Sequence, residues 1–120
     1  MIDAAAQITN PLIYRHLFNQ KAVDELTWEF FRPGIFISRI YSAEHGPSLA
    51  LLKYEPGASL GRHVHAGYEH IFVLHGSQSD DNGEHLAGTL LIHAAGTSHK
   101  VTSRNGCIVL AYWEKPVQFV

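Results

Sequence analysis

Short runs of apolar and β-branched residues, separated by turn residues, dominate the chain from residue 26 onward. Such runs are typical of the strands of a β-sandwich or β-barrel. We therefore expect an all-β fold with roughly eight to ten strands and no long helix. The expected strands are Leu26–Phe31, Ile35–Tyr41, Ser48–Tyr54, Tyr68–Gln78, Leu90–His93, His99–Ser103, Cys107–Trp113 and, after Pro116, an edge strand Val117–Val120.

Three glycine-containing turns separate these runs. Arg32-Pro33-Gly34 predicts a hairpin-like turn between the first two strands. Asp81-Asn82-Gly83 and Arg104-Asn105-Gly106 both contain Asn-Gly, the pair that accepts the positive φ angles of a primed hairpin turn. The sequence therefore predicts a tight hairpin at each of these two positions.

Residues 1–25 carry the weakest pattern. Asn10-Pro11 is a suitable start for a short helix through Leu12, Tyr14 and Leu17. An irregular arm that packs on the barrel explains the same residues equally well, and both interpretations stay open. We expect one domain, with an N-terminal arm over 1–25 and a barrel over 26–120.

Composition limits the compartment and the partners. The 120 residues carry a formal charge of −2 and no basic block, so we expect no nucleic-acid partner. The single cysteine, Cys107, forms no intrachain disulfide, which fits a reducing compartment. The longest apolar run, Ile108–Trp113, is too short to span a membrane, and the N-terminus has no signal-peptide pattern. We expect a soluble cytoplasmic protein without a membrane partner.

The nine histidines are the anomaly of the composition, and two of them form the pattern His63-x-His65. Residues two apart point to the same face of a strand, and a continuous or gently kinked ribbon also aims Glu69 inward. Two imidazoles and a carboxylate form part of a coordination sphere for a divalent metal ion. His99 is the candidate for the fourth ligand.

Without a metal ion, Glu69 would be a buried carboxylate, and we expect its pKa to be raised. Metal loss should then lower the stability of the fold. The remaining candidates are weaker ligands, and among them His93 is the best candidate for a residue beside the metal site. These weaker candidates are His70, His75, His85 and His93.

The stretch from Gly57 to Gly76 resembles the first signature of the cupin family: Gly57, five residues, His63-x-His65, three residues, Glu69, six residues, Gly76. The second signature follows as Gly88, five residues, Ala94-x-Gly96, two residues, His99, three residues, Ser103, with Ala94 in place of the usual proline and Ser103 in place of the usual asparagine. The resemblance implies a cupin jelly-roll β-barrel with one divalent metal ion on His63, His65, Glu69 and His99.

Further residues resemble the ChrR-like branch of the cupins. They are Trp28…Pro33-Gly34, Tyr54-x-Pro56-Gly57, Val73-Leu74-x-Gly76-Ser77, Asp81-x-Gly83, Ala87-Gly88-Thr89 and Ser103-x-x-Gly106-Cys107. The branch includes the zinc-binding C-terminal domain of the anti-sigma factor ChrR, and similar single-domain proteins include Fe(II) acetylacetone-type dioxygenases. The anti-sigma activity of ChrR lies in a separate N-terminal domain, which this chain lacks, so we do not expect that activity. Acetylacetone dioxygenases use three histidines without the acidic ligand, so Glu69 argues against transferring their activity directly.

Two functions follow as expectations from this resemblance. One is an Fe(II)-dependent dioxygenase that acts on a small oxygenated compound such as a β-diketone or a hydroxyaryl ketone. The other is a non-catalytic zinc-binding cupin that works as a sensor. Imidazole ligands suit iron and zinc alike, and also nickel; manganese is a further candidate. The catalytic residues and the substrate stay undetermined.

Aromatic residues bear on the ligand cavity and on self-association. Tyr112 and Trp113 alternate along one run, so one of them faces the interior and helps to make an apolar cavity for a small organic ligand. Cupins commonly form homodimers, and Leu17-Phe18 with Phe30-Phe31 offers apolar surface for one.

Overall fold

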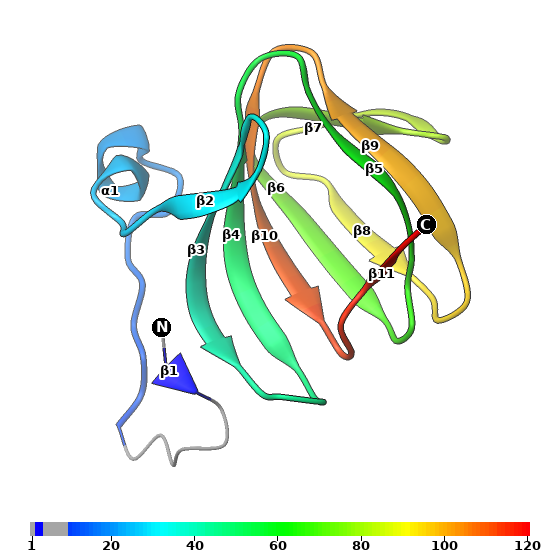
Figure 1. Cartoon of the computed structure of the whole chain (residues 1–120). Coiled ribbons are helices and arrows are strands. Elements are labelled where there is room, and N and C mark those ends of the chain that lie inside the picture. The colour runs from blue at the N-terminus through cyan, green and yellow to red at the C-terminus, as the bar shows by residue number, and fades with distance from the viewer. Residues whose placement is uncertain (1, 4–9) are drawn as a thin grey trace.

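One long strand, β6 (Glu69–Asp80), joins the two halves of a curled, mostly antiparallel sheet (Figure 1). The structure is a computed structural model that describes residues 2–3 and 10–120. The first half of β6 pairs with β8 (Leu90–His93) and β10 (Cys107–Trp113). Its second half pairs with β7 (Gly83–Leu86) and touches β9 (Ser98–Ser103). The long strand therefore belongs to both walls of an open barrel.

The remaining strands complete these two walls. On one side β10 pairs with β4 (Ser48–Tyr54), β4 with β3 (Ile35–Ser42), and β3 with β2 (Glu29–Arg32) and the two-residue β1 (Ile2–Asp3). On the other side β9 pairs with β5 (Ala58–Val64), and β5 with β11 (Gln118–Phe119). Figure 1 shows the C-terminal segment, which contains β11, crossing from the end of β10 in one wall to β5 in the other.

The prediction of an all-β fold is confirmed, and most strands lie where the apolar runs place them. Ser48–Tyr54, Leu90–His93 and Cys107–Trp113 agree with the structure at both ends. The first expected strand, over 26–31, begins only at Glu29. The short strand β7, with its exposed and polar residues, was not expected because it shows no apolar alternation.

Only one of the two Asn-Gly sequences joins paired strands. At Asp81-Asn82-Gly83 the hairpin forms between β6 and β7, but only Gly83 has a positive φ, so the primed turn predicted there is wrong. The backbone N–H of Asn82 instead donates to the Asp80 side chain at 2.8 Å. At Asn105-Gly106 the predicted hairpin is wrong, because the chain crosses from β9 in one wall to β10 in the other.

From residue 10 onward, the N-terminal arm is irregular up to its short helix, α1 (Gln20–Asp24). The helix is capped by the Asn19 side chain, which accepts from the N–H groups of Lys21 and Ala22. The helix considered at Asn10-Pro11 is absent from residues 10–18, so the arm interpretation holds there, while residues 1 and 4–9 lie outside the described residues. The division at residue 25 stays a prediction.

Both faces of the β3–β4–β10–β6 wall are buried, which explains the continuous apolar run in β4. Leu52 points into the barrel, whereas Leu51 points outward beneath the arm, where Val23 of α1 joins the packing. The interior cluster comprises Ile35, Ile37, Ala50, Leu52, Tyr54, Leu60, Ile71, Val73, Val101, Cys107, Val109 and Ala111. Among the described residues, no helix is long and apolar enough to cross a membrane.

Candidate metal centre

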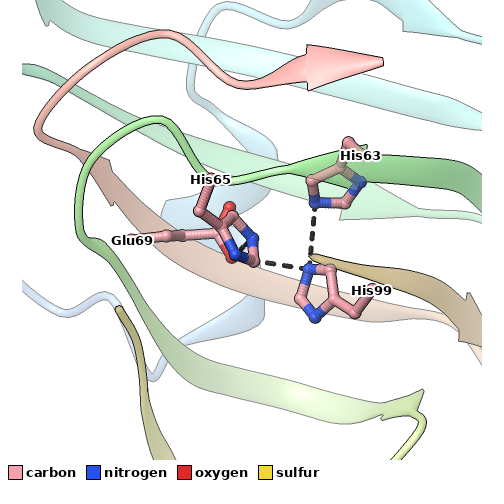
Figure 2. Close-up of side chains that lie close together, drawn as sticks. All are labelled: His63, His65, Glu69 and His99. Carbon is pink, nitrogen blue, oxygen red and sulfur yellow. Dashed lines mark hydrogen bonds and ion pairs between the residues drawn. The ribbon is translucent and has the colours of Figure 1, made fainter. Parts of the chain in front are cut away.

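The structure brings His63, His65, Glu69 and His99 together, with one potential ligand atom of each lying within 4.8 Å of the others (Figure 2). His63 on β5 lies directly opposite His99 on β9 in the antiparallel pair. His65 follows the end of β5, and its N–H and C=O bond to Thr97 and Gly96. Glu69 is the first residue of β6. Three segments therefore converge on one point.

The path between these residues differs from the single ribbon expected. β5 ends at Val64 and pairs with β9, whereas β6 starts at Glu69 and pairs with β8 and β10. The chain therefore turns over between His65 and Glu69 and enters the other wall of the barrel. A register shift between Leu60 and His63 also breaks the strict alternation in β5. The residues converge because of the barrel's curvature and these irregularities.

All four side chains are removed from solvent, with residue exposures of 1% for His63 and His65, 3% for Glu69 and 5% for His99. Buried polar groups normally have hydrogen-bond partners. In this cluster the Nε2 atom of His65 and the Oε1 atom of Glu69 have none. An unpaired buried carboxylate oxygen is costly, so this cluster calls for a positively charged occupant.

Hydrogen bonds outside the cluster set the tautomers of two histidines. The Nδ1 atom of His63 lies 2.9 Å from the Gly61 carbonyl, which can only accept. The Nδ1 atom of His65 lies 2.9 Å from the hydroxyl of Thr97, whose own proton is directed at the Ala94 carbonyl at 2.6 Å. Both Nδ1 atoms therefore carry a proton, which leaves both Nε2 lone pairs directed into the cluster.

Glu69 divides its two oxygens between the wall and the cluster. Its Oε2 accepts the indole N–H of Trp113 at 2.6 Å, which confirms that one residue of the Tyr112–Trp113 pair faces inward. Its Oε1 lies 3.1 Å from His65 Nε2 and 3.6 Å from His99 Nε2. The indole thus orients the carboxylate so that its other oxygen faces the imidazoles, and Figure 2 shows the Glu69 side chain directed toward the His65 ring.

The separations fit ligands around one ion. Ligand atoms about 2.1 Å from an ion lie about 3.0 Å apart at right angles and about 3.4 Å apart at the tetrahedral angle. The Nε2 atoms of His63 and His99 are 2.9 Å apart, and Oε1 of Glu69 lies 3.1 Å from Nε2 of His65 and 3.6 Å from Nε2 of His99. The donor set and its spacing therefore fit one divalent ion.

The electrostatics of the cluster keep the Glu69 carboxylate ionised and the His99 imidazole neutral. Burial alone would raise the pKa of Glu69, but the adjacent His65 ring, the Trp113 N–H and the His99 ring outweigh it, so the pKa is lowered. The expectation of a raised pKa for Glu69 is therefore wrong. Burial lowers the pKa of His99 to about 4, against the partial compensation of Glu69.

A second group of side chains adjoins the first, and sequence reasoning missed one of its members, Asp80. Asp80, His93 and His99 each offer a ligand atom within 4.8 Å of the others. Alternation along β6 from Glu69 places residue 80 on the outer face. A bulge at Leu74, where the pairing with β10 shifts register, breaks that alternation, so that Gly76 pairs with the inward-facing Cys107. The Asp80 side chain consequently points inward, with 1% of it exposed.

The other weaker candidates have separate partners. The Nε2 atom of His75 bonds to the Leu17 carbonyl at 2.9 Å and so ties the N-terminal arm to the barrel. His70 packs against Tyr112 on the outer face, with ring centroids 5.2 Å apart. His85 bonds through Nε2 to the carboxylate of Asp80 at 2.9 Å.

A small apolar cavity of about 20 Å³ lies beside His63, Glu69 and His99 of this cluster. Its walls come from the interior core and from the C-terminal segment, whose Phe119 ring lies 5.6 Å from the His63 ring. The lining residues are Phe31, Leu52, Tyr54, Leu60, Ile71, Gln78, Val101, Trp113, Val117 and Phe119, besides these three residues of the cluster. This volume holds about one water molecule.

Solved structures share this fold at low sequence identity. The chain aligns with a candidate acetylacetone dioxygenase from Methylibium petroleiphilum at a TM-score of 0.78 and 20% identity, over 96% of this chain and 83% of that one. An acetylacetone dioxygenase from Acinetobacter johnsonii aligns at a TM-score of 0.72 and 20% identity, over 78% of this chain and 71% of that one. The likeness shows a single all-β domain with the cupin fold.

The anti-sigma protein ChrR of Rhodobacter sphaeroides, in complex with SigE, aligns at a TM-score of 0.70 and 22% identity. The alignment covers 77% of this chain and 51% of the other, so the chain spans about half of that chain. None of the curated proteins matches the sequence. The model of the ChrR cupin-like domain matches residues 20–116, which is most of the 120 residues. The chain therefore belongs to the family of ChrR cupin-like domains.

Proposed function

We propose that this chain binds one divalent metal ion through His63, His65, Glu69 and His99 and acts as an Fe(II)-dependent dioxygenase-type enzyme on a small oxygenated organic compound. The observation that carries the proposal is the buried cluster of three imidazoles and one carboxylate, in which Nε2 of His65 and Oε1 of Glu69 have no other partner. Four protein ligands leave one or two positions open in five- or six-coordination, where a substrate can bind.

When bound, Fe(II) supplies Lewis-acid polarisation of substrate oxygens and redox chemistry with molecular oxygen. The residues of the chain hold and shield the site. Gly61 and Thr97 fix the tautomers of His63 and His65, and Trp113 fixes the orientation of the carboxylate. The apolar side chains of the cavity, among them Leu60, exclude water and favour the carbon skeleton of a small organic molecule.

The second candidate function is a non-catalytic zinc-binding module of the ChrR type. The size of the cavity favours it, because about 20 Å³ admits one water molecule and no diketone. A substrate would have to displace a wall. The C-terminal wall is held by the two residue pairs of β11 with β5 and by the Arg32 guanidinium, 4.6 Å from the centre of the Phe119 ring.

The experiment that separates these functions is oxygen uptake by metal-free protein reconstituted anaerobically with either Fe(II) or Zn(II). Substrates are a panel of β-diketones and hydroxyaryl ketones. The dioxygenase proposal predicts substrate-dependent uptake with Fe(II) in the wild type and in His70→Ala, whose side chain lies on the outer face. It predicts none in His65→Ala. Tight zinc binding without any uptake after iron reconstitution would instead support the zinc-binding module.

A homodimer and a cytoplasmic location complete the proposal. Phe18 and Phe30 are 68% and 66% exposed, which supports apolar self-association. Leu17 and Phe31, the other residues expected at a dimer surface, are partly buried against the core clusters. Light scattering of the wild type and of Phe30→Glu tests the dimer: the wild type should give twice the mass of one chain and the variant should dissociate.

A further inference from the structure

Each ring nitrogen of His99 faces a hydrogen-bond acceptor. Its Nε2 lies 2.9 Å from Nε2 of His63. That atom of the neutral His63 ring is an acceptor, because the ring proton is on Nδ1 and is donated to the Gly61 carbonyl. Its Nδ1 lies 3.8 Å from Oδ2 of Asp80. A neutral imidazole carries one N–H, so whichever nitrogen holds the proton, the other faces an acceptor. An ion on the Nε2 side removes this conflict, because the proton then belongs on Nδ1.

Asp80 is placed to accept a hydrogen bond from that Nδ1–H group. Its Oδ1 is occupied by two donors, the backbone N–H of Asn82 at 2.8 Å and Nε2 of His85 at 2.9 Å. Its Oδ2 has no partner and faces His99, and the side chain is 1% exposed.

We propose that Asp80 is a positioning residue for the metal centre: its Oδ2 holds the proton on Nδ1 of His99 and so leaves Nε2 available as a metal ligand. The inference rests on the metal site proposed above. The separation of 3.8 Å reaches hydrogen-bond length with a shift of less than about 1 Å. Carboxylates beyond a ligating histidine fix its tautomer and raise its basicity, and their loss typically weakens metal binding about 10- to 100-fold.

The variant Asp80→Asn tests this role sharply because the direction of its amide is determined. The backbone N–H of Asn82 is a fixed donor, so the amide oxygen must take the Oδ1 position. The amide NH2 then faces Nδ1 of His99 and requires a lone pair there. The ring must place its proton on Nε2, the nitrogen that would bind the metal. The change is nearly isosteric, so it alters the tautomer more than the packing.

The matched control is Asp81→Asn, which removes the same charge one residue along the chain. The Asp81 side chain is 57% exposed and pairs with Arg62 at 3.4 Å, away from His99. Zn(II) affinity is measured by competition with a chromophoric chelator for the wild type, both asparagine variants and His99→Ala. The tautomer of His99 is read from the ¹⁵N shifts of its ring in the zinc-loaded and metal-free proteins.

The proposal predicts zinc binding about 10- to 100-fold weaker in Asp80→Asn, no change in Asp81→Asn, and a protonated Nδ1 on His99 in the loaded wild type. Metal-free Asp80→Asn should show the proton on Nε2. Equal Zn(II) affinity in the two asparagine variants would overturn the proposal. It would also be overturned if the wild type bound two Zn(II) ions per chain and Asp80→Asn only one, since Asp80 would then be a ligand together with His93. If the wild type binds no zinc, or His99→Ala binds it equally well, the metal site itself fails.

Discussion

Two buried clusters lie side by side in this barrel, and they are held together by opposite means. The interior apolar cluster, which includes Ile35, Leu52 and Val109, is stabilised by packing alone. The cluster of His63, His65, Glu69 and His99 is equally buried but leaves Nε2 of His65 and Oε1 of Glu69 without partners. The first cluster supplies stability, whereas the second is costly until a cation occupies it.

The largest effect should come from the apolar cluster. Ile35→Ala removes a fully buried side chain that lies outside the lining of the metal-site cavity. We expect the free energy of unfolding to fall by about 2–5 kcal/mol, with the folded variant still binding one metal ion per chain. Urea unfolding and elemental analysis check both points. A folded variant that had lost its metal would show that the two clusters are not separable.

Metal removal should have the next largest effect. Binding to the folded state alone stabilises it by about 2.7 kcal/mol when free metal is 100 times its Kd. The melting temperature should therefore rise with metal in the wild type and in Ile35→Ala but not in His63→Ala. Calorimetric scans with and without chelator measure this, and an equal rise in His63→Ala would place the ion elsewhere.

Trp113→Phe should have a smaller effect, because it removes one donor and leaves Oε2 of Glu69 buried without its partner. We expect metal-free protein to lose about 1–3 kcal/mol of stability, together with weaker metal binding. Trp28→Phe is the matched control, since its indole donates to the neutral Val23 carbonyl at 3.0 Å, which should cost only about 0.5–1.5 kcal/mol. If both variants lost the same free energy of unfolding and kept their metal affinity, the Trp113 indole would not be what orients Glu69.

A change of pH near neutrality should have the smallest effect on the stability of the metal-free protein. Burial lowers the pKa of His99 from 6.5 to about 4, so the unfolded chain takes up this proton first. The contribution to stability is therefore complete above pH 6.5, is lost as the pH falls toward 4, and changes no further below it. The lowered pKa of Glu69 continues the loss at lower pH. The melting temperature of metal-free protein, measured at several pH values, should follow this course. A melting temperature that increases as the pH is lowered from 6.5 to 4 would contradict it.

The sequence was sufficient to predict which residues meet at the centre, because the spacing of His63, His65, Glu69 and His99 reflects positions on strands that the barrel brings together. It was not sufficient to predict the path. The turn between His65 and Glu69 depends on β5 and β6 joining different walls, and pairing between distant strands leaves no local pattern. The same reason explains the wrong hairpin at Asn105-Gly106.

Asp80 and the pKa of Glu69 were missed for a different reason. Alternation fails in β6 at the bulge at Leu74, so counting from Glu69 places residue 80 on the wrong face. The pKa of Glu69 depends on His65 and Trp113, and neither contact can be inferred from burial alone. Burial can be predicted from patterns of apolar residues, whereas the partners of a buried polar group require the three-dimensional structure.

The central claim is that four side chains of this cluster hold one metal ion, and its most direct test is elemental analysis of protein purified without a metal-affinity column. Wild type and His70→Ala, whose ring lies on the outer face against Tyr112, should each carry about one divalent ion per chain after dialysis with metal. His63→Ala and Glu69→Gln should carry far less. Folded wild-type protein that retains no ion, or an equal metal content in all four proteins, would contradict the account.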